Sequence, residues 1–309
     1  MYFLGDPAPE ERLVAVFSMG DFTFYGDESY GHEDAYAVAG YVASVGQWEG
    51  FIKQWKQLAH DEGFTILHKT DLENNVKGSE FEWPELTSSE KFEKKTRINK
   101  RACSIILSHA LGGVGQAVQR SEWQRSITEH KSNWPRVVGR SFYAAGVIGC
   151  LDFVAELMER KRRVGMVRYV FEDKKRDGRG EAEDLLRELK ADPRTRDKFR
   201  IAGYSFERKD DPEFIPLQAA DFLAYESYRQ IDNQILGGGF KVNSRGDLIK
   251  PRGALRCLLR ADDPQYKDVD GWDLPVPHKG SWMSAQTIRD FVAHVERGLG
   301  SVDLVNLDD

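Results

Sequence analysis

The stretch Asp21-Phe-Thr-Phe-Tyr-Gly-Asp-Glu-Ser-Tyr30 determines how the rest of the chain is organised. Its aromatic and β-branched residues favour a strand over 22–25, because such side chains suit a pleated, half-buried surface. Two carboxylates, Asp27 and Glu28, follow Gly26 directly, and 34–44 forms a second apolar strand. The first strand is therefore expected inside a sheet. A buried acid at its end requires a cation or hydrogen-bond donors, so we predict that Asp27 is a metal ligand.

Composition limits the class of protein. The 309 residues are 40% hydrophobic, enough for one large domain or two small ones. No segment approaches the roughly 20 apolar residues of a membrane helix, and the acidic start of the chain does not resemble a secretory signal. Three widely spaced cysteines are expected to be buried free thiols. We expect a cytoplasmic protein that does not contact a membrane. The cysteines are Cys103, Cys150 and Cys257.

Charge is distributed unevenly along the chain, whose formal net charge is −6. Residues 1–100 contain 10 Lys/Arg and 18 Asp/Glu, a net of −8, whereas 160–200 contain 15 and 9, a net of +6. A local basic face on an acidic protein can hold a phosphate backbone. The alternative is a solvated helical surface.

Patterns along the chain predict alternating strands and helices. The sequence predicts further strands at 64–67, 114–118, 166–171 and 199–206, and helices at 47–62, 91–110, 143–163, 181–189, 216–231 and 284–299. The polar segment 71–89 is expected to be a loop or insertion. An antiparallel pair followed by alternating helices and strands indicates a mixed α/β sheet with helices on its faces. We expect one domain over 13–236, with 237–309 as an extension packed on it.

Acidic residues occur in three unusual places. Asp27 and Glu28 follow one strand, Glu172 and Asp173 follow another, and Asp221 is the sole charge in Pro216-Leu-Gln-Ala-Ala-Asp-Phe-Leu-Ala-Tyr225. If these acids converge, they provide oxygen ligands for Mg²⁺ or Mn²⁺. Such ions activate a water and stabilise the leaving oxygen of a phosphodiester.

Each acidic position also has a structural interpretation. Asp27-Glu28-Ser29 can form a turn, and Glu172-Asp173 can form surface ion pairs with the following basic residues. Asp221 can be a structural acid paired with an arginine. His68, which follows the short strand predicted at 64–67, can be a packing histidine instead of a ligand.

The acidic motifs resemble a known family. Asp27-Glu28-Ser29 with the strand Ala37-Val-Ala-Gly-Tyr-Val42, and the later Gln218-Ala-Ala-Asp-Phe-Leu-Ala224, are similar to the two signature motifs of the bacterial domain-of-unknown-function 3800 family. The resemblance covers about residues 20–235. That family is similar to ribonuclease-H-like nucleases and integrases, which implies a five-stranded mixed sheet with acids on the first strand, a middle strand and a late helix. Its usual glycine after Asp-Glu-Ser is Tyr30 here, with Gly31 one place later.

The resemblance implies roles for individual residues. Asp27, Glu28, Asp173 and Asp221 would be catalytic, and Asp27, Asp221 and either Glu172 or Asp173 would bind metal. Ser29, Gln218 and His68 would support the site, with Gln218 orienting Asp221. Next to the middle acid, four basic residues are candidates for phosphate contacts: Lys174, Lys175, Arg176 and Arg179.

Three functions are compatible with this sequence. The first is a Mg²⁺- or Mn²⁺-dependent nuclease acting on DNA or RNA. The second is a catalytically silent nucleic-acid-binding or assembly module of a defence or mobile-element system. The third is a hydrolase of a small phosphorylated substrate, with 71–89 as a lid. The Trp-rich helix at 47–62, with Trp272 and Trp282, is a candidate contact in a homo-oligomer.

Overall fold

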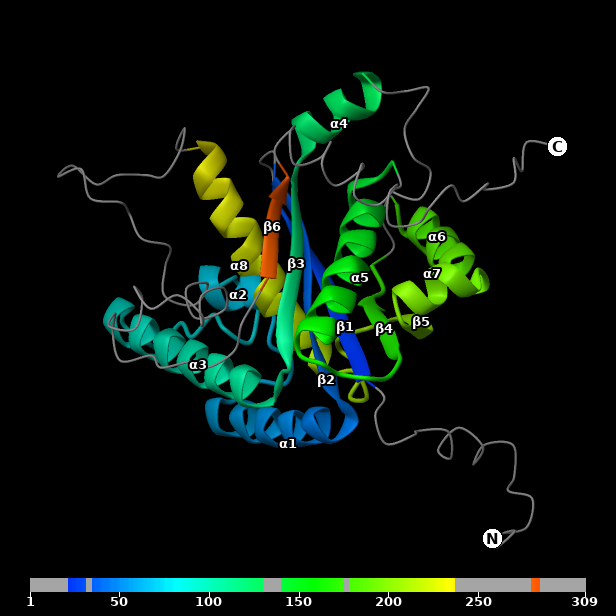
Figure 1. Ribbon diagram of the computed structural model, residues 1–309. Helices are drawn as coiled ribbons and strands as arrows, with labels where there is room; N and C mark the ends of the chain where they lie inside the picture. The colour runs from blue at the N-terminus through cyan, green and yellow to red at the C-terminus, as the bar shows by residue number, and fades with distance from the viewer. Residues whose placement is uncertain (1–21, 32–34, 130–139, 175–177, 237–278, 284–309) are drawn as a thin grey trace, which may run out of the picture.

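A computed structural model describes residues 22–31, 35–129, 140–174, 178–236 and 279–283. One mixed sheet lies at its centre, with helices on both faces (Figure 1). The strand order is β5-β4-β1-β2-β3-β6. The strands are β1 (Phe22–Tyr30), β2 (Ala35–Ser44), β3 (Gly112–Gln119), β4 (Val167–Glu172), β5 (Ile201–Glu207) and β6 (Lys279–Met283). The prediction of an α/β fold with a mixed five-stranded sheet is confirmed for β1–β5, and β6 adds a sixth strand at the edge.

Strand directions determine which chain segments meet at each edge of the sheet. β1 and β2 are antiparallel, as are β2 and β3, whereas β4 runs parallel to β1 and β5 parallel to β4. β1, β3, β4 and β5 therefore all point the same way, and their carboxyl ends lie at one edge. The register places Gly26 beside Phe171, so the residues that follow these two lie next to each other at that edge.

Helices bury both faces of the sheet. On one face lie α1 (Val45–Glu62), α3 (Ser88–His109) and α8 (Pro216–Leu236), with the short α2 (Lys69–Asn74) beside them. On the other lie α5 (Phe142–Arg160), α6 (Arg179–Ala191) and α7 (Pro193–Lys198). α4 (Arg120–Glu129) extends beyond the end of β3 (Figure 1).

Alternation along the central strands separates the two cores. Val38 and Val42 of β2 pack with α5, whereas Ala39 and Tyr41 pack with α1, α3 and α8. Successive strand residues point to opposite faces, so a strand covered on both faces is apolar throughout. The continuous apolar run of β2 in the sequence reflects this double coverage.

Three expectations differ from the structure or lie outside it. The strand predicted at 64–67 is wrong, because the backbone N–H groups of Thr65 and Ile66 donate to the Glu80 carboxylate and do not join a ladder. Part of the loop predicted at 71–89 belongs to α2, and Phe81 and Trp83 from the same segment are buried in the core. The helix predicted at 284–299, and all of the extension 237–309 except β6, lie outside the described residues. Cys103 and Cys150 are buried free thiols, as predicted.

Candidate acidic site

Three acids from distant segments surround one lysine ammonium group. Lys209 Nζ lies 2.9 Å from Asp27 Oδ2, 2.9 Å from Asp221 Oδ1 and 3.2 Å from Glu172 Oε2. Asp27 comes from β1, Glu172 from β4 and Asp221 from α8. All four side chains are at least nine-tenths buried. The structure thus brings the acids of the three motifs to one place, and a single cationic group touches all of them.

Strand alternation explains which acids meet. Phe24 and Phe171 pack toward α5. Asp27 comes three residues after Phe24, and Glu172 one residue after Phe171. Because successive strand residues point to opposite faces, both acids point to the face that α8 covers. Asp27 follows the Gly26–Phe171 pair in the parallel ladder and lies beside Glu172. Asp221 reaches the same place from the buried side of α8.

Asp173 lies apart from this cluster. It directly follows β4, its backbone N–H donates to the carbonyl of Glu207, and its carboxylate pairs with Arg179 at 2.8 Å. Of the two adjacent candidates for the middle acid, Glu172 joins Asp27 and Asp221, and Asp173 forms the type of peripheral ion pair that the structural interpretation described.

Lys174 provides a second ammonium group and connects the cluster to Glu28. Its Nζ lies 2.7 Å from Asp27 Oδ1, 2.7 Å from Glu172 Oε2 and 3.6 Å from Glu28 Oε1. Glu28 is next to Asp27 on β1 and therefore points to the α5 face, where its charge raises the pKa of Tyr36 and Tyr143 in addition to the effect of their burial. Lys174 thus contacts acids from both faces at the edge of the sheet.

The backbone of the α2 segment fixes the Asp221 carboxylate. The N–H of Lys69 donates to Asp221 Oδ2 at 2.7 Å. The ammonium group of Lys69 is fully buried and bound by Glu73, Asn99 and Glu226, at 2.5, 2.8 and 3.0 Å. This network connects α2, α3 and α8, so it holds the donor N–H in place below the acid.

Gln218 contacts the segments around Asp221, one turn before it on α8. Its Oε1 accepts from Trp55 Nε1 at 2.8 Å and from the N–H of Leu67 at 2.9 Å. Its Nε2 donates to the carbonyl of Lys209 at 3.4 Å. Gln218 therefore positions the two segments that supply the partners of Asp221, instead of bonding that carboxylate itself.

Burial and neighbouring charges shift the pKa values in opposite directions. Burial raises the pKa of Asp27, but Lys174 and Lys209 outweigh it, so the pKa of this carboxyl lies well below its usual range. Burial and the charge of Asp27 raise the pKa of Glu172 to about 9. The carboxylates raise the pKa of both lysines against the effect of burial. The pKa shifts therefore favour an ionised Asp27 beside a protonated Glu172, with both lysines charged.

The donor chemistry of this cluster fits a divalent cation. Carboxylate oxygens are the preferred ligands of Mg²⁺ and Mn²⁺, and four acids outnumber the two ammonium groups. In the described part of the chain, however, no three His, Cys, Asp or Glu side chains are already arranged as a metal site. Lys209 Nζ contacts Asp27, Glu172 and Asp221. A metal ion held by Asp27, Glu172 and Asp221 would take the place of that ammonium group.

The remaining predicted residues have mixed placements. Ser29 lies on β1 opposite Ala37. His68 immediately precedes Lys69 at the start of α2, and its buried Nδ1 has no hydrogen-bond partner among the described residues. Arg179 pairs with Asp173 and Glu183 and stacks on Phe206. Lys175 and Arg176 lie outside the described residues.

Sequence reasoning missed Lys209 and Lys69. Lys209 comes two residues after the end of β5, and β5 runs parallel to β4, so Lys209 lies at the same edge of the sheet as Glu172. Lys69 carries no comparable signal, because its partners Asn99 and Glu226 are far away in the sequence.

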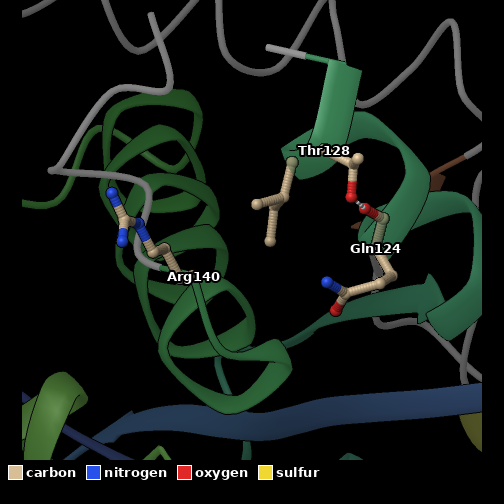
Figure 2. Close-up of a pocket in the computed structure, with 4 residues that line it drawn as sticks. Gln124, Thr128 and Arg140 are labelled. Atoms are coloured by element: carbon tan, nitrogen blue, oxygen red, sulfur yellow. Dashed lines mark hydrogen bonds between the residues drawn. The ribbon is translucent and has the colours of Figure 1, made fainter. Parts of the chain in front are cut away.

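A separate pocket of about 280 Å³ lies between α4 and the start of α5 (Figure 2). Its described lining consists of Gln124, Ile127, Thr128 and Arg140. None of the acids of the cluster lines it, so its shape says nothing about their chemistry.

The sequence matches no known protein-family profile, and no curated protein matches it at a significant level. The family resemblance therefore depends on the motifs themselves. No helix in the described ranges is long and apolar enough to cross a bilayer.

Proposed function

We propose that this chain is a ribonuclease-H-like, divalent-metal-dependent nuclease that cleaves DNA or RNA at the acidic cluster. One observation carries the proposal: acids at positions 27, 172 and 221, from three distant segments, lie within 3.2 Å of one ammonium group. A mixed sheet with acids on its first strand, a middle strand and a late helix is the arrangement that the family resemblance implies. The fold supports the resemblance in these respects.

Each residue of the acidic cluster would have a distinct role in cleavage. Asp27, Glu172 and Asp221 would hold Mg²⁺ or Mn²⁺, and Glu28 would be a further ligand or proton acceptor. The bound metal would supply an activated water and stabilise the leaving oxygen of the phosphodiester. Lys174 and Lys209 would then lose carboxylate partners and become available to phosphate oxygens, to which ammonium groups bind as point charges. Asp173 and Arg179 would keep the end of β4 in place.

Cleavage by the purified protein tests the proposal. With Mg²⁺ or Mn²⁺, the chain should cleave single- or double-stranded DNA or RNA, and Asp221→Asn should abolish cleavage. Asp210→Asn is the matched control, because Asp210 is close to Lys209 in sequence but pairs with Arg208 at the surface. Equal activity of the parent protein and Asp221→Asn would refute the assignment, as would equal loss in the control.

One observation favours a second function, a catalytically silent binding or assembly module. Lys174 and Lys209 already satisfy the carboxylates, which a structural ion cluster would also require. Such a module would show salt-sensitive nucleic-acid binding without turnover. Mg²⁺ would raise the melting temperature of a metal-binding enzyme, because the ion binds only the native state, and it would leave that of the silent module unchanged.

A further inference from the structure

An arginine and a tyrosine stack lie at the same sheet edge as the acids, on the opposite face. Tyr30 ends β1 and pairs with Tyr36 of β2, which in turn pairs with Val118 of β3. Arg120 begins α4 two residues after Val118. Because β1 and β3 point the same way, this row and the acids share the carboxyl edge of the sheet.

Arg120 lies among three aromatic rings. Its Cζ lies 5.5 Å from the ring centre of Tyr30, 5.7 Å from that of Tyr36 and 5.8 Å from that of Phe142. Its Nε is buried and has no hydrogen-bond partner among the described residues. Rings orient a guanidinium group but leave its N–H donors unused. The ring contacts are made through the face of the guanidinium group, so they do not occupy the in-plane N–H groups with which an arginine binds an anion.

Tyr30 is the accessible ring of the stack. It is 37% exposed, whereas Tyr36 is 8% exposed. Their ring centres are 5.7 Å apart and their planes differ by 11°. The buried Tyr36 thus holds Tyr30 in a fixed orientation at the surface, as a base-stacking platform requires.

This group lies next to Glu28. Glu28 precedes Tyr30 by two residues on the same face of β1, about 6.6 Å along the strand. Arg120 lies 5.7 Å from the ring centre of Tyr36, which packs on the same face of the sheet as Glu28 and pairs with Tyr30. A nucleic-acid strand bound to Arg120 and Tyr30 would therefore lie next to Glu28, at the edge of the sheet where the acids are.

We propose that Tyr30 and Arg120 form a nucleotide-binding subsite, in which the tyrosine stacks on a base and the arginine binds the adjoining phosphate. This inference rests on the proposed function and names its substrate class, single-stranded nucleic acid. A base can lie on Tyr30 only when it is out of a duplex stack, and stacking is tolerant of sequence. Planar guanidinium groups match phosphate oxygens in a bidentate way.

Binding measurements in an inactive background test the subsite. Asp221→Asn protein is titrated against a fluorescent single strand of roughly ten nucleotides, within the usual site size, and anisotropy is recorded at several salt concentrations. Adding Tyr30→Ala should weaken binding about tenfold, whereas Tyr30→Phe should retain it. Adding Arg120→Gln should weaken binding and reduce the salt slope by about 0.7. Arg120→Lys, which keeps the charge, should restore the slope.

Three controls make the outcome decisive. Phe92→Ala, an exposed aromatic on α3, and Arg194→Gln, a surface arginine paired with Asp192, should leave binding unchanged. An abasic strand should bind Tyr30→Ala and its parent equally, and so should a blunt duplex. Equal binding of the ordinary single strand by Tyr30→Ala and Tyr30→Phe would overturn the subsite. An Arg120→Gln protein that melts earlier but binds normally would show that Arg120 only anchors α4.

Failure of this subsite is distinguishable from failure of the proposed nuclease. If the parent chain cleaves nucleic acid but Tyr30→Ala binds normally, the subsite is refuted and the nuclease stands. If nothing is cleaved but Tyr30→Ala loses affinity for the single strand, the subsite stands within a binding module.

Discussion

Lys209 Nζ donates to Asp27 Oδ2 at 2.9 Å across 182 positions of the chain. This bond ties the segment after β5 to the end of β1. Both side chains are buried, so the pair has lost its hydration and depends on mutual attraction and on Asp221, Glu172 and Lys174. Lys209 thus has the position that a metal ion bound by the same acids would have.

Replacing Lys209 should therefore reveal the competition between the ammonium group and a metal. Without metal, Lys209→Met should lower the free energy of unfolding by about 3–5 kcal/mol, because breaking a buried ion pair leaves uncompensated charge. With Mn²⁺, the melting temperature of the variant should rise more than that of the parent, since the ion no longer displaces a lysine. Calorimetric titration should show tighter Mn²⁺ binding.

Lys198→Met is the control for this experiment, since Lys198 is partly exposed and lies 3.8 Å from Asp152, outside the cluster. Its response to Mn²⁺ should equal that of the parent. Equal stabilisation of Lys209→Met and the parent by Mn²⁺ would contradict the competition.

The raised pKa of Glu172 predicts a dependence of stability on pH. In the folded protein the pKa of this carboxyl is about 9, against an ordinary value of 4.5. The folded state thus holds an extra proton between these values, and the free energy of unfolding should fall as the pH rises from about 5 to about 9. The lowered pKa of Asp27 has the opposite effect, but only in the acid range below its ordinary value of 3.8.

Glu172→Gln isolates this effect, because the amide cannot ionise. Urea denaturation should give similar stability for the variant and the parent near pH 5, and a more stable variant near pH 9. Parallel curves over this range would show that the pKa of Glu172 is not raised in the folded protein.

Gln218 should be important for stability independently of any activity. Gln218→Ala leaves the buried N–H donors of Trp55 and Leu67 without an acceptor, and each such group costs about 1–3 kcal/mol. Urea denaturation should show a loss of about 2–5 kcal/mol. Gln57→Ala, at an exposed glutamine bonded to Asp61, should change stability by less than about 0.5 kcal/mol.

A double-mutant cycle separates the two donors. Trp55→Phe removes the indole N–H, so combining it with Gln218→Ala should cost less than the sum of the single changes. Additive losses would mean that the Trp55 bond contributes nothing.

Gly40 marks a close approach of β2 to β1. A Cβ added at Gly40 would lie 1.9 Å from the carbonyl oxygen of Tyr25 and 2.7 Å from the Cα of Gly26. Backbone atoms of a central strand cannot give way, so Gly40→Ala should lower the free energy of unfolding by roughly 3 kcal/mol or more. Gly46→Ala in α1 meets nothing within 4 Å and should be neutral or stabilising by up to about 1 kcal/mol. Equal melting temperatures for the two variants would contradict this packing.

Much of this architecture follows from local patterns. The apolar run of β2 indicated the fold class, and the acids at the ends of β1 and β4 and on α8 were predicted to converge, but the middle acid was left open between Glu172 and Asp173. Strand alternation could also have selected Glu172 over Asp173. Val167, Tyr169 and Phe171 point toward α5, so Glu172 points to the opposite face, as Asp27 does.

The rest depends on partners remote in sequence. The strand expected at 64–67 does not form because its N–H groups find acceptors on Glu80 and Gln218, up to 151 positions away. The ammonium group of Lys209 likewise belongs to the cluster only because β5, β4 and β1 lie side by side. No window of neighbouring residues contains that information.

The position of α8 in the chain has a consequence for biosynthesis. Gln218 and Asp221 are the last of the clustered residues to leave the ribosome. The N–H groups that donate to them have no acceptor there before α8 is made, and they belong to Trp55, Leu67 and Lys69. Until residues 216–236 emerge, a nascent chain has the first acids but neither their third partner nor the hydrogen bonds that fix the α2 segment. A truncated product should therefore lack the assembled cluster and fold poorly, which couples completion of translation to the appearance of the site.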